Sequence, residues 1–583
     1  MIRLPFRRAA TDVPADPFAP MGANAPAPRA AAEGDADRRR AARRLQFTAA
    51  CFLVAFGAVG FRMAAVAASD GGPGARGVAE TGITSARADI VDRSGHLLAT
   101  NVRATALYAQ PHMMVDPVAA ADGLKGIFPD LDRAAWERRL SSDRKFFWIK
   151  GNISPEQRQA VHDLGEPGLL FAEREMRVYP NGALAAHVLG GARFGAQDVR
   201  AAEIVGIAGV EGKLDERLRG EAPLRLSIDL PVQSAVEQVL ASGMALMGAK
   251  GAAAILMDVR TGEVRALASL PDFDPNARPR AAVEGDPGDS PLFNRAVQGV
   301  YELGSTFKIF AAAQALELGL VNRATMVDLA TPLPKGGTHI RDFHYLGRER
   351  SVEDIIVESS NIGTARLAMR IGAKRQREFL TSLGFTEPTG VELTESARPL
   401  VPSRWNDPYV MTISFGHGLG ASPLHLAAGY ASLLNGGTRV RPTLLADEAV
   451  AEGPRVVSPR VSAESRWMLR QVVARGTASM ARVPGYAIGG KTGTADKPKH
   501  TGGYWDDKVV TTFASVLPAD DPRYVLVVTL DEPENTTGPE ARRTAGWTAV
   551  PVAGEIVARV APLLGIRPDD GPDDIARYAA AAR

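Results

Sequence analysis

Cysteine is almost absent from this chain. Cys51 is the only one among 583 residues and lies within an apolar run, so no intrachain disulfide can form. The nine histidines and Cys51 show no metal-ligand spacing, and we expect neither a metal nor a cofactor. An excess of charge of one sign is also lacking: the net charge is +2, which gives no reason to expect a nucleic-acid partner.

The rest of the composition is that of folded domains. A content of 45% hydrophobic and 23% charged residues suits globular domains with full cores. With 583 residues the chain is too long for one ordinary domain, so we expect two or more.

One long hydrophobic run stands near the N-terminus. Residues 45–67 carry a single charged side chain, and a helix of that length can cross the hydrocarbon layer of a membrane. Five arginines within residues 38–44 should stay cytoplasmic, which places everything after the helix outside. We therefore expect a disordered cytoplasmic tail over 1–44 and a transmembrane helix over 45–67. A cleaved signal peptide ending near Ala67 is the alternative, but the charged leader is too long for one.

The first exported region, residues 68–220, is expected to be a spacer and docking domain. Residues 86–99 alternate around a Ser-Gly turn and predict a β-hairpin. Residues 112–170 have helical periodicity, with a helix start at Ser154-Pro-Glu-Gln157. No catalytic constellation appears here.

The second region, residues 221–565, predicts an antiparallel sheet covered by helices, which is an α+β fold. Asp229 and Pro231 open a helix that runs through Leu240. Residues 566–583 form a C-terminal tail. The other predicted elements are hairpins over 252–259 with 263–269 and 509–517 with 523–530, a helical insertion over 305–440 and a helix over 550–564.

The first of three motifs in this region is Ser305-Thr-Phe-Lys308. Ser305 precedes a buried helical run, so its N–H and the helix dipole favour a negative charge beside it. Lys308 follows three positions later on the same face. A lysine in an apolar pocket near a second lysine can lose its proton and activate a serine hydroxyl. Alone, this pair is more often a helix cap followed by a surface lysine.

The second motif is Ser359-Ser360-Asn361, before the helical run that starts at Thr364. The Ser359 hydroxyl can relay a proton between Lys308 and a leaving amine, and Asn361 can bind a substrate amide and hold Lys308. The alternative is a set of N-cap residues for the following helix, which is the favoured role for Ser360.

The third motif is Lys491-Thr492-Gly493-Thr494. Gly493 removes a side chain where another backbone must approach closely. An edge strand here could pair with an extended peptide while Lys491, Thr492 and Thr494 hold its terminal carboxylate. The Thr494 N–H could complete an oxyanion hole with that of Ser305. Alone, this is most often a glycine-rich hairpin with a surface lysine.

The three motifs in this order resemble those of a class B penicillin-binding protein, a peptidoglycan D,D-transpeptidase. The resemblance covers about residues 80–560. Its further blocks are Arg87-Ala-Asp-Ile-Val-Asp92-Arg93-Ser-Gly95 (with Ala88 where the family usually has Gly), Gly209-Val-Glu211-Gly212, Asn294-Arg295-Ala296, Ser414-Phe-Gly416-His-Gly418 and Thr511-Thr-Phe513-Ala514.

The resemblance implies a transpeptidase domain of the penicillin-binding and serine β-lactamase type, with an antiparallel sheet flanked by helices and an all-helical subdomain. An elongated α+β pedestal (dimerisation-type) domain and one transmembrane helix precede it. Ser305 would attack the carbonyl between two terminal D-Ala residues of a stem peptide and release D-Ala. Lys308 would be the base, Ser359 the proton relay and Asn361 the positioning residue, with the third motif as carboxylate clamp. β-Lactams would acylate the same serine.

The region 68–220 lacks the Glu-Asp signature of a glycosyltransferase, which argues against a bifunctional enzyme. Tyr301-Glu302 before the nucleophile, the length and the cytoplasmic tail favour the division type over the lateral-wall (elongation) type, although Leu303 stands where proline is common. The resemblance then implies stem peptides on lipid-linked glycan strands as substrates. It also implies a polytopic glycan polymerase and other division-complex membrane proteins as partners. The expected location is the bacterial inner membrane at midcell, single-pass, with the catalytic domain periplasmic.

Two other functions compete. A membrane-bound serine β-lactamase or antibiotic sensor would need a positioned general base for deacylation, and no convincing glutamate is found for it. A non-catalytic scaffold would not need Ser305, Lys308 and Lys491 intact.

Overall fold

The chain separates into two compact units, residues 1–82 and residues 83–583. The predicted tail over 1–44 and most of the predicted tail over 566–583 lie outside the described residues. The computed structural model describes residues 46–47, 50–60, 87–195, 204–281, 283–335, 338–446, 453–499 and 502–569.

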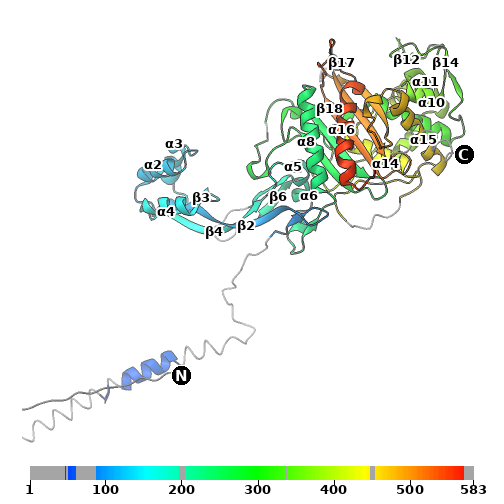
Figure 1. Cartoon of the computed structure of the whole chain (residues 1–583). Coiled ribbons are helices and arrows are strands. Elements are labelled where there is room, and N and C mark those ends of the chain that lie inside the picture. Colours follow the sequence, from blue (N-terminus) through cyan, green and yellow to red (C-terminus); the bar gives the residue numbers. More distant parts are fainter. Residues whose placement is uncertain are drawn as a thin grey trace, which may run out of the picture. The chain divides into compact units, whose positions relative to one another are not determined.

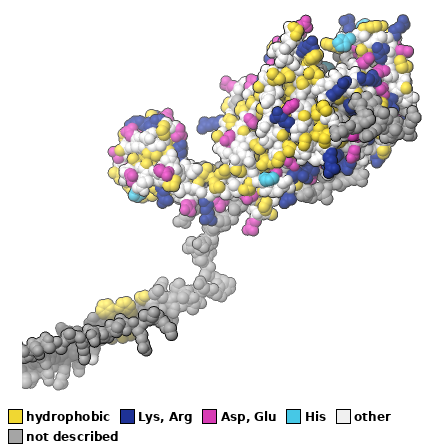
Figure 2. Space-filling model, viewed as in Figure 1, with side chains coloured by type: hydrophobic (Ala, Val, Ile, Leu, Met, Phe, Trp, Pro, Cys, Tyr) yellow, Lys and Arg dark blue, Asp and Glu magenta, His cyan; other side chains and the backbone are white. Residues whose placement is uncertain are grey.

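In the first unit the structure describes a helix over residues 50–60. Its large side chains are exposed, among them Phe52 and Phe56, whose rings stack with centroids 6.3 Å apart. Figure 2 shows this helix as a run of hydrophobic surface. Within the described residues, no helix is both long enough and apolar enough to span a membrane. The rest of the predicted span over 45–67 lies outside them.

The second unit begins with an α+β part, here called the pedestal, that is built on one long ladder. β2 and β4 pair antiparallel from Thr100 opposite Val178 to Ala109 opposite Leu169, and Figure 1 shows them side by side. β1 pairs with the start of β2, which confirms the predicted hairpin over 86–99. The elements are β1 (Ile90–Val91), β2 (Leu97–Ala109), α2 (Pro117–Ile127), α3 (Arg133–Leu140), β3 (Phe147–Lys150), α4 (Pro155–Asp163), β4 (Leu169–Val178), α5 (Ala186–Leu189), β5 (Gly191–Phe194), β6 (Ile204–Ala208), α6 (Gly209–Lys213), α7 (Asp215–Leu218) and β7 (Leu224–Arg225).

Three helices pack at the Ala109 end of this ladder. α2, α3, α4 and β3 enclose a separate core that includes Leu124 and Phe147. The helical periodicity of residues 112–170 is thus confirmed, and α4 begins where the sequence predicts. Ser154 accepts a hydrogen bond from the Gln157 N–H, and the Gln157 side chain accepts one from the Ser154 N–H. This reciprocal pair satisfies two donors that a helix start leaves free.

A five-stranded antiparallel sheet in the order β16-β17-β18-β8-β9 organises the rest of the second unit, from α8 onward, which carries the three motifs and is here called the catalytic part. Both predicted hairpins are confirmed. β8, β9 and β18 are buried along nearly their whole length, because helices cover both faces of the sheet. α8 and α16 pack together on one face (Figure 1), and α14 contacts the strands from the other. The strands are β8 (Gly251–Asp258), β9 (Val264–Leu270), β16 (Gly489–Pro498), β17 (Tyr504–Leu517) and β18 (Tyr524–Asp531).

The helix predicted from Asp229 is confirmed but is longer than expected. The Asp229 side chain caps α8 by accepting from the Val232 N–H, and α8 continues to Leu246 rather than ending at Leu240. The buried stripe continues beyond Leu240, since Gly243 lies against α16 so closely that a Cβ there would be 2.6 Å from Val552. The helices are α8 (Leu230–Leu246), α9 (Lys308–Glu317), α10 (Val352–Val357), α11 (Asn361–Ile371), α12 (Ala373–Ser382), α13 (Asp407–Ser414), α14 (Pro423–Leu434), α15 (Pro459–Arg475) and α16 (Ala549–Leu563), and the remaining short strands are β10 (Tyr301–Glu302), β11 (Met326–Asp328), β12 (Pro334–Lys335), β13 (Thr338–His339), β14 (Glu349–Ser351) and β15 (Gly420–Ala421).

A buried carboxylate closes the base of the pedestal. Glu211 of α6 is fully buried and accepts from Arg87 Nε at 2.5 Å, from Arg177 Nε at 2.6 Å and from the Tyr179 hydroxyl at 3.3 Å. Arg87 also pairs with Asp215 at 2.7 Å. These contacts join the first residues of the unit, the end of β4 and the segment that leads into the catalytic part.

Replacing this carboxylate should destabilise the fold. Glu211→Ala leaves two buried guanidinium groups without their partner, so we expect the free energy of unfolding to fall by about 3–5 kcal/mol. Urea unfolding of the full-length chain in detergent measures the change. Glu216→Ala, on the exposed side of α7, is the matched control and should change the stability by less than about 0.5 kcal/mol. Equal effects of the two substitutions would contradict the importance of the buried network.

Candidate active site

Strand β16 carries the third motif at the edge of the sheet. It pairs with β17 on one side, with Lys491 opposite Ala514 and Thr494 opposite Thr511. The Lys491 side chain is fully buried and Thr492 is 8% exposed. The other side of β16 is therefore available for a main chain that adds to the sheet.

Ser305 lies in a short 3-10 turn, Gly304–Phe307, that leads directly into α9. The sequence predicts a buried helical run directly after Ser305, and the structure shows this tighter turn before the α-helix begins at Lys308. The Lys308 N–H donates to the Ser305 carbonyl, so the two residues stand one turn apart on the same element. Ser305 itself is half-buried.

Two glycines allow the Ser305 turn to lie directly on β16. Gly304 has φ 57°, and a Cβ there would be 2.8 Å from the Thr494 carbonyl oxygen. A Cβ on Gly493 would be 2.4 Å from the Leu303 carbonyl oxygen. Neither position can hold a side chain without moving the backbone. This close approach places the turn that carries Ser305 beside β16, the strand that carries Lys491.

A third glycine fixes the same turn from the opposite side. The Gly304 N–H donates to the Gly416 carbonyl at 3.2 Å, and a Cβ on Gly416 would be 2.0 Å from the Gly304 oxygen. Glu302 accepts from the Gly418 N–H at 2.6 Å and from the Tyr504 hydroxyl at 3.0 Å. This explains why the Ser414–Gly418 block belongs to the site, although it carries no obvious reactive group.

The second motif occupies the turn between α10 and α11. Ser359 has φ 64°, which is the left-handed region that non-glycine residues rarely adopt. Ser360 caps α11, and its hydroxyl accepts from the Gly363 N–H at 3.0 Å. The N-cap that was predicted as the alternative is therefore present at Ser360. Ser359 beside it is strained, so the cap does not exclude the proton-relay role predicted for Ser359.

The structure brings Lys308, Ser359 and Lys491 together at one point. Lys308 Nζ and Lys491 Nζ each donate to Ser359 Oγ at 3.0 Å. Lys308 Nζ also donates to the Ser359 carbonyl oxygen. Three elements far apart in the sequence thus meet on a single hydroxyl, and one of them carries Ser305 one turn before Lys308.

Burial lowers the pKa of both lysines. The Lys308 pKa lies well below its usual range, first because the side chain is buried, then because Lys491 is near, with Asp342 acting in the opposite direction. Burial lowers the Lys491 pKa to about 7. Two ammonium groups on one hydroxyl in a buried site repel each other, so the pair favours holding one neutral amine. A neutral Lys308 amine can accept a proton.

Asn361 has a different partner from the predicted one. Its side-chain nitrogen donates to the Arg341 carbonyl at 2.9 Å, whereas Lys308 bonds to Ser359. Asn361 therefore holds the neighbouring loop, and its amide oxygen remains at the half-buried end of α11.

Asp342 is a residue of this site that sequence reasoning missed. Its carboxylate accepts from the Ser360 hydroxyl at 2.8 Å, from the Asn361 N–H at 2.5 Å and from the Ile362 N–H at 3.1 Å. It thereby fixes the start of α11 and adds a negative charge near Lys308. No periodicity or spacing links it to the motif, because it lies in an irregular loop.

The threonines of β16 are held from two sides. Thr492 Oγ1 lies 2.9 Å from Thr477 Oγ1 and accepts from Lys491 Nζ at 3.3 Å. Thr494 Oγ1 accepts from the Ala545 N–H at 3.0 Å and keeps its own proton to donate. Thr477, which follows α15, was also missed by sequence reasoning. The strand thus presents hydroxyl donors and an ammonium, which suit a carboxylate.

Taken together, these groups supply the parts of an acyl-transfer site. A serine at a helix start, an amine of lowered pKa, a relaying hydroxyl and an anion-binding edge strand are the requirements for forming and resolving an acyl-enzyme.

Comparisons with known proteins give the same family over most of residues 82–557. Residues 252–557 match the model of the penicillin binding protein transpeptidase domain, and residues 82–227 match that of the penicillin-binding protein dimerisation domain. The chain is 38% identical over 502 residues to the probable peptidoglycan D,D-transpeptidase FtsI of Caulobacter vibrioides, covering 83% of this chain and 82% of that protein.

More distant relatives extend the likeness. The peptidoglycan D,D-transpeptidase FtsI of Escherichia coli K12 is 28% identical over 522 residues, covering 84% of this chain and 85% of that protein. The crystal structure of penicillin binding protein 3 from Mycobacterium tuberculosis, complexed with aztreonam, is similar with a TM-score of 0.62. It has 28% sequence identity and covers 84% of this chain and 97% of the crystallised chain. The chain therefore belongs to the class B penicillin-binding proteins, with a dimerisation domain followed by a transpeptidase domain.

Proposed function

We propose that this chain is a peptidoglycan D,D-transpeptidase of the septal type, which cross-links stem peptides through an acyl-enzyme on Ser305. The observation that carries the proposal is the pair of buried lysines, each 3.0 Å from the Ser359 hydroxyl, with Lys308 one helical turn after Ser305. The substrate class follows from relatives that are named as peptidoglycan D,D-transpeptidases.

Substrate binding uses the edge of β16. The D-Ala-D-Ala end of a stem peptide lies along the strand, and Gly493 keeps the turn that carries Ser305 close to it. Its terminal carboxylate takes hydrogen bonds from Lys491, Thr492 and Thr494. Asn361 positions a substrate amide with its carbonyl oxygen.

Acylation begins when the neutral Lys308 amine takes the Ser305 proton and the oxygen attacks the carbonyl between the two D-Ala residues. The N–H groups of Ser305 and Thr494 stabilise the oxyanion; the Thr494 main chain lies against Gly304, directly before Ser305. Ser359 then passes a proton to the leaving amine, the C–N bond breaks, and D-Ala departs.

Deacylation runs through the same groups in reverse. The amine of a neighbouring stem peptide attacks the ester carbonyl, loses a proton through Ser359 to Lys308, and forms the new peptide bond. Ser305 regains its proton and is released. A β-lactam acylates Ser305 by the same first step, but its opened ring does not leave.

The same proposal covers organisation and location. We assign a cytoplasmic tail to 1–44, a single transmembrane helix to 45–67, a dimerisation-type domain to 68–220, the transpeptidase domain to 221–565 and a tail to 566–583. The boundary falls just before β7, which pairs with β1 of the pedestal. The run of arginines before residue 45 supports an inner-membrane protein with a periplasmic catalytic domain at midcell. A polytopic glycan polymerase and other division-complex membrane proteins are the proposed partners.

Loss of the nucleophile should abolish covalent labelling. Ser305→Ala removes the oxygen that bonds to the acyl group, so labelling by a fluorescent penicillin should fall by more than about 10³-fold. Gel fluorescence of the full-length chain measures it. Ser242→Ala, on the exposed face of α8, is the matched control and should label normally. Persistent labelling of the Ser305→Ala chain would place the nucleophile elsewhere.

The preference for a carboxylate should depend on pH. Burial lowers the Lys491 pKa to about 7, so the free enzyme loses this cation as the pH rises through that value. Acylation by benzylpenicillin and by its methyl ester both depend on Lys308 as the base, so the pH dependence of Lys308 cancels in the ratio of the two acylation rates. This ratio should fall by roughly tenfold between about pH 6 and about pH 9. A ratio that stays constant over this range would remove Lys491 from carboxylate binding.

The septal role predicts a division defect. Cells whose only copy carries Ser305→Ala should keep elongating without dividing, because septal cross-linking stops while lateral-wall synthesis continues. Microscopy of these cells and of a tagged, unaltered copy measures cell length and position. Accumulation along the side wall and never at midcell would assign the chain to elongation.

A further inference from the structure

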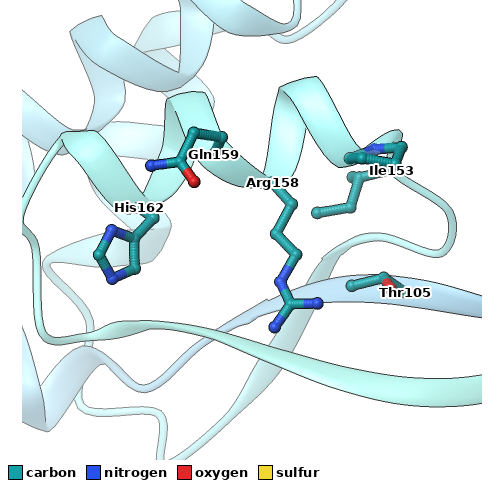
Figure 3. A pocket seen from close by; sticks show the side chains of 6 residues that line it. Thr105, Ile153, Arg158, Gln159 and His162 are labelled. Carbon is teal, nitrogen blue, oxygen red and sulfur yellow. The ribbon is translucent and has the colours of Figure 1, made fainter.

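The pedestal contains a hollow that plays no part in acyl transfer. Its volume is about 380 Å³, and it lies between α4 and the strands. Figure 3 shows Arg158 reaching from α4 toward the strands, with His162 on one side and Thr105 and Ile153 on the other. The lining residues are Thr105, Ile153, Pro155, Arg158, Gln159 and His162.

Arg158 is a cation without a carboxylate partner among the described residues. Its guanidinium lies over the Phe171 ring at 5.4 Å, which orients it without neutralising it. Arg133 of the same helical group, by contrast, pairs with Asp122 and with Glu137. A guanidinium held on a ring keeps its donors free for a planar, bidentate acceptor such as a carboxylate.

One edge of β2 opens onto the same hollow. β1 pairs with β2 no further than Ala99, and β3 pairs with it only from Leu107. Among the described strands, residues 100–106 of β2 therefore have β4 alone as a neighbour. The Thr105 carbonyl accepts from the Ile153 N–H at 2.9 Å on the open side. Because hydrogen-bonding directions alternate along an antiparallel strand, the main chain of Arg103 also faces this side.

Two acidic side chains limit what can bind. On β4, Glu173 lies opposite Thr105 and Glu175 opposite Arg103, and Glu173 is exposed. A segment along the open edge would have Arg103 and Thr105 of β2 as direct neighbours, with the two glutamates one strand further away and Arg158 in the hollow. Charge complementarity to Arg158 therefore favours a carboxylate in the hollow, and the two glutamates disfavour further acidic residues on the segment.

We propose that an extended segment of a partner protein adds to β2 beside residues 102–105 and places one carboxylate against Arg158 in this hollow. The main chain of Arg103 supplies hydrogen bonds for strand addition, and His162 supplies a further polar contact to the carboxylate. The Gln159 amide donates to Asp163 at 2.7 Å. The site is independent of the acyl-transfer chemistry and is held by a different part of the chain.

Site-specific photo-crosslinking in native cells tests the proposal with the full-length chain. p-Benzoylphenylalanine replaces Gln159 as the probe, and the same residue at exposed Arg138 of α3 is the control position. Mass spectrometry identifies the crosslinked segment. We expect crosslinking from position 159 and not from 138, to one segment with a single Asp, Glu or C-terminal carboxylate among neutral residues.

A synthetic peptide of that segment then measures the contribution of each group. Fluorescence anisotropy with the full-length chain should show roughly tenfold weaker binding for Arg158→Ala. Arg158→Lys should restore only part of the affinity, because lysine lacks the planar fork. Replacing the peptide's carboxylic acid by its amide should weaken binding to the unaltered chain by the same roughly tenfold factor. It should not weaken binding to the Arg158→Ala chain any further. Hydrogen exchange at the Arg103 amide should slow when the peptide binds.

Several results would overturn the proposal. They are an absent crosslink, a crosslink to a helical or acid-free segment, unchanged affinity of Arg158→Ala, or an unprotected Arg103 amide. Penicillin labelling of the Arg158 variants should equal that of the unaltered chain, which shows that they fold. Failure here would leave the acyl-transfer proposal untouched, since that proposal depends on labelling at Ser305.

Discussion

The Ser359 hydroxyl receives hydrogen bonds from two lysines that the fold has removed from water. Burial of an ammonium is costly, and burial of two beside each other is more so, because neither has bulk water to screen it. The free energy is lowest when one of the two lysines is deprotonated. In the proposed mechanism the neutral lysine then serves as the base, and the remaining cation is available for the substrate's carboxylate. The lowered pKa of the base thus follows from the burial of the two lysine side chains.

The rest of the catalytic part holds this arrangement in place against that repulsion. The sheet fixes Lys491, α9 fixes Lys308, and the turn before α11 fixes Ser359, so the three groups cannot separate without disrupting three elements. Close backbone contacts at Gly304 and Gly493 add the serine turn to the same rigid frame. Asp342 supports the frame from the loop side through three hydrogen bonds at the start of α11. Preorganisation of this kind lets the donors act without reorganising during the reaction.

Local patterns in the sequence predicted much of this molecule, and long-range partners were beyond them. The hairpins, the Ser154 capping box and the Asp229 cap were predictable because each depends on residues a few positions apart. The three motifs were predictable as a set because their order resembles a known family. Asp342 was not, because its partners lie 18 to 20 positions away across an irregular loop. The hydrogen bond from Asn361 to the Arg341 carbonyl was unpredictable for the same reason. The end of α8 differs from its predicted position because tertiary packing extends the buried face of that helix.

The left-handed backbone of Ser359 narrows what mutation can try at this position. Threonine is the natural chemical substitute for serine, since it carries the same hydroxyl and is one nucleotide away in the genetic code. A β-branched residue is strongly disfavoured at positive φ, however, so threonine would shift the very oxygen that it preserves. Glycine fits the backbone but brings no oxygen. Selection for antibiotic escape therefore has almost no room at this position.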